Sequence, residues 1–173
     1  MATEKMVEDI IREVLKSMYQ AQESQSAAPK TSSSKYGLTP DKDYPMSSKR
    51  PELLKTPTGK HLADITLEKV LSGDVTPKDV SIAPETLRMQ AEIADGVNRT
   101  QFGDNLRRAA ELTAVPDKRI LEIYNAMRPN RSTKAELLAI ADELDQQYSA
   151  SLNAALLREA ADVYERRNRL RTE

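Results

Sequence analysis

The sequence predicts an all-α protein, made of a small helical domain, an extended proline-rich arm and a separate N-terminal amphipathic helix. Three observations lead to this prediction. Apolar residues recur along most of the chain at the i, i+3, i+4 spacing of one helical face. No segment shows the alternation of apolar and polar residues that is typical of a β-strand. Four prolines between residues 36 and 60 exclude long helices and central strands in that part of the chain.

The first predicted element is an amphipathic helix within residues 1–20. Its apolar residues lie on one helical face: Met6, Val7, Ile10, Ile11, Val14, Leu15 and Met18. Acidic and basic residues are balanced on the other side. This balance disfavours a membrane-surface helix, which would be basic, and a transit peptide, which would contain few acidic residues. We therefore interpret the apolar face as a docking face for a partner protein.

Two irregular segments follow this helix. Residues 21–35 are rich in Ser, Gln and Ala and are predicted to be a disordered linker. Residues 36–60 carry a proline every five or six positions, with apolar residues between them. The simplest interpretation is an extended arm that lays apolar side chains onto a surface, which another subunit could provide.

Residues 61–173 are predicted to form the helical domain. Residues that typically begin or end helices divide this part of the chain into six helical stretches. These are a short helix between Thr66 and Gly73, one from Pro84 to about Gly96, one from Phe102 to Leu112, one from Asp117 to just before Pro129, one beginning at Ser132 or Thr133, and one containing Leu152 to Val163.

The last two of these helices are expected to pack as an antiparallel pair. Thr133 and Glu136 have the spacing of a capping box, and the connection near Ser149 is short. In the final helix the predicted apolar seam consists of Leu152, Leu156, Ala160 and Val163, with Leu157 and Tyr164 beside it.

The composition excludes several classes of protein. The formal net charge is −1, from 26 basic and 27 acidic residues, so no field of one sign favours nucleic acid or an anionic membrane. The chain has no cysteine, which excludes disulfides and thiolate ligands and fits a reducing cytoplasm. No apolar run approaches the roughly 20 residues of a membrane span, and no secretory signal is recognisable.

The search for catalytic motifs finds little. His61 is the only histidine. The stretch from Thr58 to His61, TGKH, has part of a phosphate-binding loop, but the upstream glycine of that motif is replaced by Leu54. We therefore favour a structural role for His61, and no catalytic, cofactor-binding or metal-ligating residue is assigned to this chain.

Two clusters of charged residues admit a functional and a structural interpretation. Asp142, Glu143 and Asp145 have the chemistry of a metal site, but polar residues are also expected between the apolar positions of a surface helix. The arginines between Arg166 and Arg171 could contact phosphates, but positive charge at a helix C-terminus also complements the helix dipole. We favour the structural interpretation in both cases.

Long stretches of the chain resemble the small, or gamma, subunits of adenosylcobalamin-dependent diol and glycerol dehydratases. The string from Arg108 to Leu144, RAAELTAVPDKRILEIYNAMRPNRSTKAELLAIADEL, carries the strongest likeness. The upstream strings DYPMSSKRPELLKTPTGKHLADITLEKVLSG and APETLRMQAEIA resemble the same family. The resemblance runs from about Asp43 to the C-terminus.

The resemblance implies a noncatalytic subunit of a radical hydro-lyase. Family members join large, medium and small subunits, usually as a dimer of heterotrimers, and convert propane-1,2-diol to propanal or glycerol to 3-hydroxypropanal. Adenosylcobalamin and a metal ion at the substrate site are bound by the other subunits, so the family has no catalytic residue to carry onto this chain. Such enzymes are often housed in bacterial microcompartments, where the helix in residues 1–20 would dock to shell or cargo proteins.

Two alternatives remain open from the sequence. The small subunit could belong to a glycerol dehydratase, although the N-terminal extension of about 35 residues favours the diol enzyme. The chain could instead be a helical adaptor or regulatory binding module without an enzymatic role.

Overall fold

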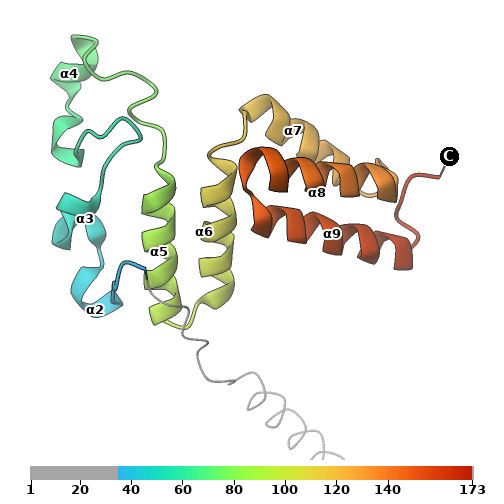
Figure 1. Ribbon diagram of the computed structural model, residues 1–173. Helices are drawn as coiled ribbons and strands as arrows, with labels where there is room; N and C mark the ends of the chain where they lie inside the picture. The colour runs from blue at the N-terminus through green and yellow to red at the C-terminus, as the bar shows by residue number, and fades with distance from the viewer. Residues whose placement is uncertain (1–34, 173) are drawn as a thin grey trace, which may run out of the picture. The chain divides into compact units, whose positions relative to one another are not determined.

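The computed structural model describes residues 35–172, and in this range the chain is helical apart from one β-bridge between Lys55 and His61. This confirms the predicted all-α class. The helical elements, shown in Figure 1, are α2 (Pro40–Asp43), α3 (Met46–Lys49), η1 (Pro51–Leu53), η2 (Leu62–Asp64), α4 (Leu67–Leu71), α5 (Pro84–Gly96), α6 (Thr100–Leu112), α7 (Asp117–Ala126), α8 (Lys134–Tyr148) and α9 (Ser151–Arg166).

Helices α5 and α6 lie side by side as a hairpin (Figure 1). Pro84 occupies the first position of α5, as the sequence predicted, because its fixed φ suits a helix start. The two helices approach closely at Gly103. A Cβ atom there would lie 2.5 Å from a carboxylate oxygen of Asp95 and 3.2 Å from the carbonyl oxygen of Ala91. The same carboxylate of Asp95 pairs with Arg107 of α6. The close contact at Gly103 and this ion pair together hold α5 against α6.

Helices α8 and α9 form the predicted antiparallel pair. The capping box of α8 is confirmed: the Glu136 N–H donates to the Thr133 hydroxyl at 3.3 Å, and the Thr133 N–H donates to the Glu136 carboxylate at 2.8 Å. Ser149 ends α8 in the left-handed conformation with a φ of 52°. This reversal lets α9 begin only two residues later and pack back along α8.

The main core lies where α7, α8 and α9 meet the end of α6. Its buried members are Val115, Ile123, Ala141, Leu144, Ala150, Ala154 and Leu157. Eight of the 19 buried apolar residues in the described part of the chain are alanines. Small side chains at these positions let the helices approach closely, which compensates for the scarcity of large aromatic residues.

The proline-rich arm is more helical than the sequence analysis predicted. Pro40 begins α2 and Pro51 begins η1, and no element of the arm exceeds four residues. The prediction that prolines exclude long helices was correct. The prediction of an extended arm was wrong in detail, because a proline at the first position of a helix favours a single turn.

The arm packs on this chain's own α5. Leu38 and Met46 are buried against Met89 and Ile93 of α5. The Glu92 carboxylate also accepts the backbone N–H of Leu38, at 3.4 Å. The arm therefore belongs to the folded body.

The predicted apolar seam of α9 was wrong at Leu152 and Leu156, whereas Leu157, predicted beside the seam, is buried. Leu152 and Leu156 are exposed, whereas Asn153, Ala154, Leu157 and Ala161 are buried. The buried face is rotated from the leucine-rich seam because α8 and α6 both contact α9 closely. Alanine and asparagine fit these close contacts better than leucine.

Glu111 of α6 caps the N-terminus of α9. One carboxylate oxygen accepts the Leu152 N–H at 3.0 Å, and the other accepts the Asn153 N–H at 3.0 Å and the Asn153 side-chain amide at 2.8 Å. The same amide donates to the Arg108 carbonyl at 3.0 Å. The residue before α9, Ala150, has no side chain that can cap the helix. A glutamate about 40 positions earlier therefore supplies the cap.

Replacing Glu111 with alanine should destabilise the protein, because two backbone N–H groups and a buried amide lose their acceptor. We expect Glu111→Ala to lower the free energy of unfolding by about 1–2 kcal/mol in urea denaturation. The matched control is Glu159→Ala, at an exposed position of α9. It should change the free energy by less than about 0.5 kcal/mol, and losses of equal size from both variants would contradict the capping role.

Candidate functional site

The predicted docking face lies outside the described residues. It consists of Met6, Val7, Ile10, Ile11, Val14, Leu15 and Met18. Its role therefore stays a prediction, and the candidate sites below all lie within residues 35–172.

The acidic cluster of α8 is held in ion pairs with arginines of the neighbouring helices. The Arg119 Nε atom of α7 lies 2.8 Å from a Glu143 oxygen, and Arg158 of α9 lies 2.8 Å from Asp142 and 3.2 Å from Asp145. The pairing raises the pKa of Arg119 and lowers the pKa of Glu143. These carboxylates connect α8 to both neighbours. Within residues 35–172, no group of three or more His, Asp or Glu side chains could hold a metal ion.

His61 is exposed and lies at the start of η2, where its backbone N–H donates to the Asp64 carboxylate at 3.1 Å. The preceding stretch forms a tight turn at Gly59, whose φ is +85°. Across this turn the Thr56 N–H donates to the Lys60 carbonyl at 2.9 Å. The stretch that has part of a phosphate-loop motif is thus a reverse turn.

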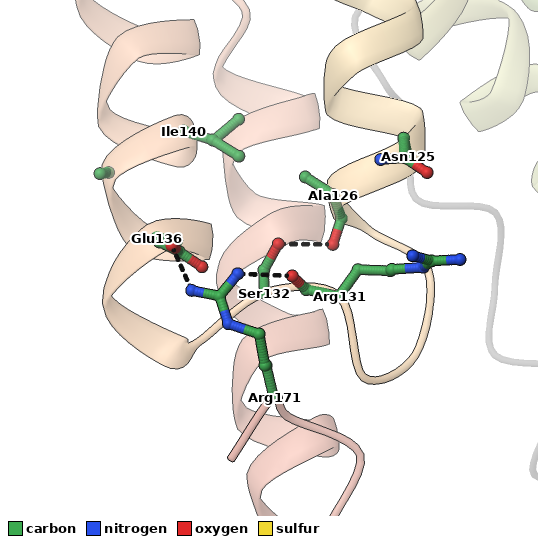
Figure 2. Close-up of a pocket in the computed structure, with 8 residues that line it drawn as sticks. Asn125, Ala126, Arg131, Ser132, Glu136, Ile140 and Arg171 are labelled. Carbon is green, nitrogen blue, oxygen red and sulfur yellow. Dashed lines mark hydrogen bonds and ion pairs between the residues drawn. The ribbon is translucent and has the colours of Figure 1, made fainter. Parts of the chain in front are cut away.

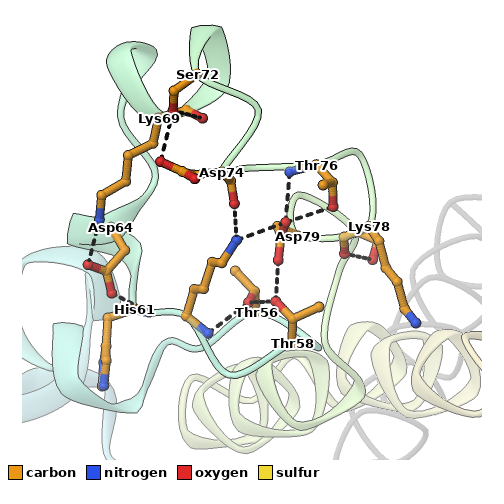
Figure 3. Close-up of polar contacts among 12 residues, drawn as sticks. Thr56, Thr58, His61, Asp64, Lys69, Ser72, Asp74, Thr76, Lys78 and Asp79 are labelled. Atoms are coloured by element: carbon orange, nitrogen blue, oxygen red, sulfur yellow. Dashed lines mark hydrogen bonds and ion pairs between the residues drawn. The ribbon is translucent and has the colours of Figure 1, made fainter.

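The side chains of this turn converge on a buried carboxylate, Asp79, which is 3% exposed (Figure 3). Asp79 accepts hydrogen bonds from the Thr58 hydroxyl and, both at 2.7 Å, from the N–H and the hydroxyl of Thr76. The Lys60 ammonium lies 3.1 Å away. These contacts, with that of Thr58 the largest, hold the pKa of Asp79 well below its ordinary value of 3.8.

The sequence analysis missed Asp79. A signal was present, because Thr76 and Asp79 have the spacing of a capping box. The contribution of Thr58 and Lys60, about 20 positions away, has no sequence signal. We call residues 55–82 the Asp79 segment, because this carboxylate holds its two ends together.

The C-terminal arginines are partly structural, as the sequence interpretation favoured. Arg171 donates to the Arg131 carbonyl at 3.0 Å and pairs with Glu136 at 2.7 Å. Its backbone N–H donates to the Ser132 carbonyl at 2.9 Å. The tail is therefore held against the loop that precedes α8.

An open groove of about 480 Å³ lies beside this tail (Figure 2). Its lining residues are Asn125, Ala126, Arg131, Ser132, Glu136, Ala139, Ile140 and Arg171. Its central polar groups already have partners, since the Ser132 hydroxyl donates to the Ala126 carbonyl at 2.9 Å and Arg171 binds Glu136. These contacts fix the tail and leave no convergent set of groups for a ligand.

Exposed apolar side chains are the most prominent surface feature. Thirteen large apolar residues of the described chain are exposed: Tyr44, Leu62, Leu67, Val70, Leu71, Val80, Ile82, Val97, Phe102, Leu121, Tyr124, Leu152 and Leu156. Six of them lie in the Asp79 segment. No helix in the described part of the chain has the length and apolar character needed to cross a bilayer.

Comparisons with known proteins identify a family. A sequence model of the family described as dehydratase small subunit matches residues 39–171. The chain is 53% identical over 165 residues to the propanediol dehydratase small subunit of Citrobacter freundii, with 95% of each chain covered. It is 51% identical over 165 residues to the propanediol dehydratase small subunit of Salmonella typhimurium strain LT2, again with 95% of each chain covered.

Replacing Asp79 with asparagine should loosen the Asp79 segment without unfolding α5–α9. The expected result is faster hydrogen exchange at residues 56–80, because the donors of Thr58, Thr76 and Lys60 lose a charged acceptor. Amide exchange measured by mass spectrometry checks this, with Asp74→Asn as the control at an exposed position of the same segment.

The pH dependence provides a second readout. Because folding lowers the pKa of Asp79, its stabilising contribution is complete well above pH 3.8 and is lost as the pH falls below that value. The wild-type segment should therefore lose protection in acid more steeply than Asp79→Asn. An identical acid profile for both chains would contradict the assignment.

Proposed function

The chain belongs to the dehydratase small-subunit family, and we propose that it is the noncatalytic small subunit of a propanediol dehydratase. The observation that carries the proposal is the identity of 51–53% over 95% of both chains to two propanediol dehydratase small subunits. The proposed partners are the large (alpha) and medium (beta) subunits, in a dimer of heterotrimers. The exposed apolar side chains support a role as one member of an assembly.

In this proposal the complex converts propane-1,2-diol to propanal and water by a radical mechanism, and it also accepts glycerol. Adenosylcobalamin supplies the radical chemistry when it is bound. Within residues 35–172, no cluster of side chains fits a metal ion: His61 is exposed, and the carboxylates of α8 are paired with arginines. We therefore assign both groups to the other subunits and derive no step of the reaction from this chain.

We favour the diol enzyme over a glycerol dehydratase because both relatives are named propanediol dehydratase small subunits and their alignments include the N-terminal extension. The family match begins at residue 39, but the alignments with the two relatives cover 165 of 173 residues and so must reach into the extension. The extension is thus common to this chain and to proteins named as propanediol dehydratase small subunits.

We further propose that the helix within residues 1–20 directs the complex to a bacterial microcompartment in the cytoplasm. Its apolar face would enter a groove or pair with a helix of a shell or cargo protein. Residues 21–35 would serve as the linker that separates this helix from the folded body.

Co-expression with the large and medium subunits should give a stable complex with equal numbers of the three chains. This complex should form aldehyde from propane-1,2-diol only when adenosylcobalamin is present. Size-exclusion chromatography and an aldehyde assay measure these outcomes. Complete assembly and full activity without this chain would refute the proposed function. A chain that purifies as a stable monomer and binds nucleic acid with a steep salt dependence would favour the adaptor alternative.

Removing residues 1–35 should leave the activity of the assembled complex intact, raise its solubility and weaken its encapsulation. The point variant Ile10→Asp/Val14→Asp should reproduce the loss of encapsulation, because it places charge on the apolar face. The matched control, Glu8→Gln/Glu13→Gln, changes the polar side only and should be encapsulated normally. Co-sedimentation with purified microcompartments measures this, and a shortened chain that assembles correctly but loses activity contradicts the proposal.

A further inference from the structure

The Asp79 segment buries a carboxylate at its centre and leaves most of its large apolar side chains exposed. Among residues 62–82, only Val75 and Asp79 are buried. In α4, by contrast, Leu67 is 75% exposed and Leu71 is 79% exposed. The segment is organised by hydrogen bonds and ion pairs to Asp79, with almost no apolar core of its own. This arrangement leaves a large apolar area in water, which is unfavourable unless another molecule covers it.

We propose that this apolar area is the docking surface for another subunit of the dehydratase complex, an inference that rests on the proposed function. The exposed apolar side chains of the segment, called the α4 surface below, are Leu62, Leu67, Val70, Leu71, Val80 and Ile82.

The charges of the segment identify the kind of partner. Residues 55–82 contain four lysines and four carboxylates, so their formal charges sum to zero. Two of the carboxylates are paired locally, Asp64 with Lys69 at 3.0 Å and Asp79 with Lys60 at 3.1 Å. Nucleic acids and anionic membranes select surfaces with an excess of positive charge. A neutral surface rich in leucine and valine matches the apolar face of a protein.

The position of the surface in the chain connects it to assembly. It lies inside residues 39–171, the part that the dehydratase small-subunit family model matches, whereas the predicted docking helix lies outside that part. The α4 surface therefore lies in the part of the chain that the family model defines, and we assign it to assembly of the enzyme. The targeting role stays with residues 1–20.

Helices α7 and α9 each expose fewer large apolar residues than the Asp79 segment does. Helix α7 exposes Leu121 and Tyr124, and α9 exposes Leu152 and Leu156. Neither pair lies on a segment that is organised around a buried carboxylate. The segment that carries the α4 surface is also held together before docking, because Asp79 joins the turn before η2, through Thr58, to the loop after α4, through Thr76 (Figure 3). A surface ordered in advance loses less conformational entropy on binding.

The test replaces two leucines in the full-length chain and measures its affinity for the other two subunits. Glutamine retains a helix propensity close to that of leucine, so Leu67→Gln/Leu71→Gln removes apolar surface with little effect on α4. We expect the dissociation constant to rise about tenfold per leucine. The matched control is Leu121→Gln on α7, where the leucine is 68% exposed, and it should raise the constant by less than about threefold.

A second variant keeps the test valid if α4 is disturbed. Val80→Thr preserves the side-chain shape outside any helix and should raise the dissociation constant about threefold. Hydrogen exchange of the free chains verifies that residues 55–82 keep their wild-type protection.

The outcomes separate the two proposals. Failure of the wild-type chain to bind the other subunits would refute the proposed function and this inference with it. Normal wild-type assembly with unchanged affinity of the α4 variants would refute the inference alone, as would an equal or larger loss from Leu121→Gln. Loss of a homodimer, or of binding to anionic lipid vesicles, in the α4 variants with no loss of subunit affinity would assign the surface to a different occupant and also refute it.

Discussion

The contact between Glu111 and the N-terminus of α9 joins the two halves of the described fold. Helix α6 ends where α9 begins, and the Glu111 carboxylate accepts two backbone N–H groups and the buried amide of Asn153. The α5–α6 hairpin and the α8–α9 pair each have their own packing. This capping contact, together with the core at the end of α6, fixes the position at which they meet.

Asp79, like Glu111, joins parts of the chain that are distant in the sequence. It too accepts backbone and side-chain donors from residues distant in the sequence. Around Glu111, however, apolar side chains are turned inward and form a core, whereas around Asp79 they are turned outward. A buried carboxylate with several donors can thus order a segment that has almost no hydrophobic core. The result is a rigid platform with an apolar outer surface, which suits a subunit that contributes contacts instead of chemistry.

Prediction from the sequence was most accurate where structure depends on near neighbours. The start of α5 at Pro84 and the capping box of Thr133 and Glu136 were correct, since each depends on residues within one helical turn. The buried face of α9 was wrong because spacing alone favours leucine, whereas the close approach of α6 and α8 favours Asn153 and Ala154. The pairing of the α8 carboxylates could not be predicted from the sequence, because their arginine partners come from the neighbouring helices α7 and α9.

The sequence by itself determined the all-α class and most helix boundaries, because these depend on local backbone preferences. It also determined the resemblance to dehydratase small subunits, because the chain shares long strings of residues with them. The tertiary structure alone decided which apolar residues are buried, since burial depends on which elements meet in space. It placed Leu38 and Met46 of the arm against α5, and it left Leu67 and Leu71 in solvent. The carboxylates that organise the fold, Glu111 and Asp79, were recognisable only once their distant donors had been brought to them.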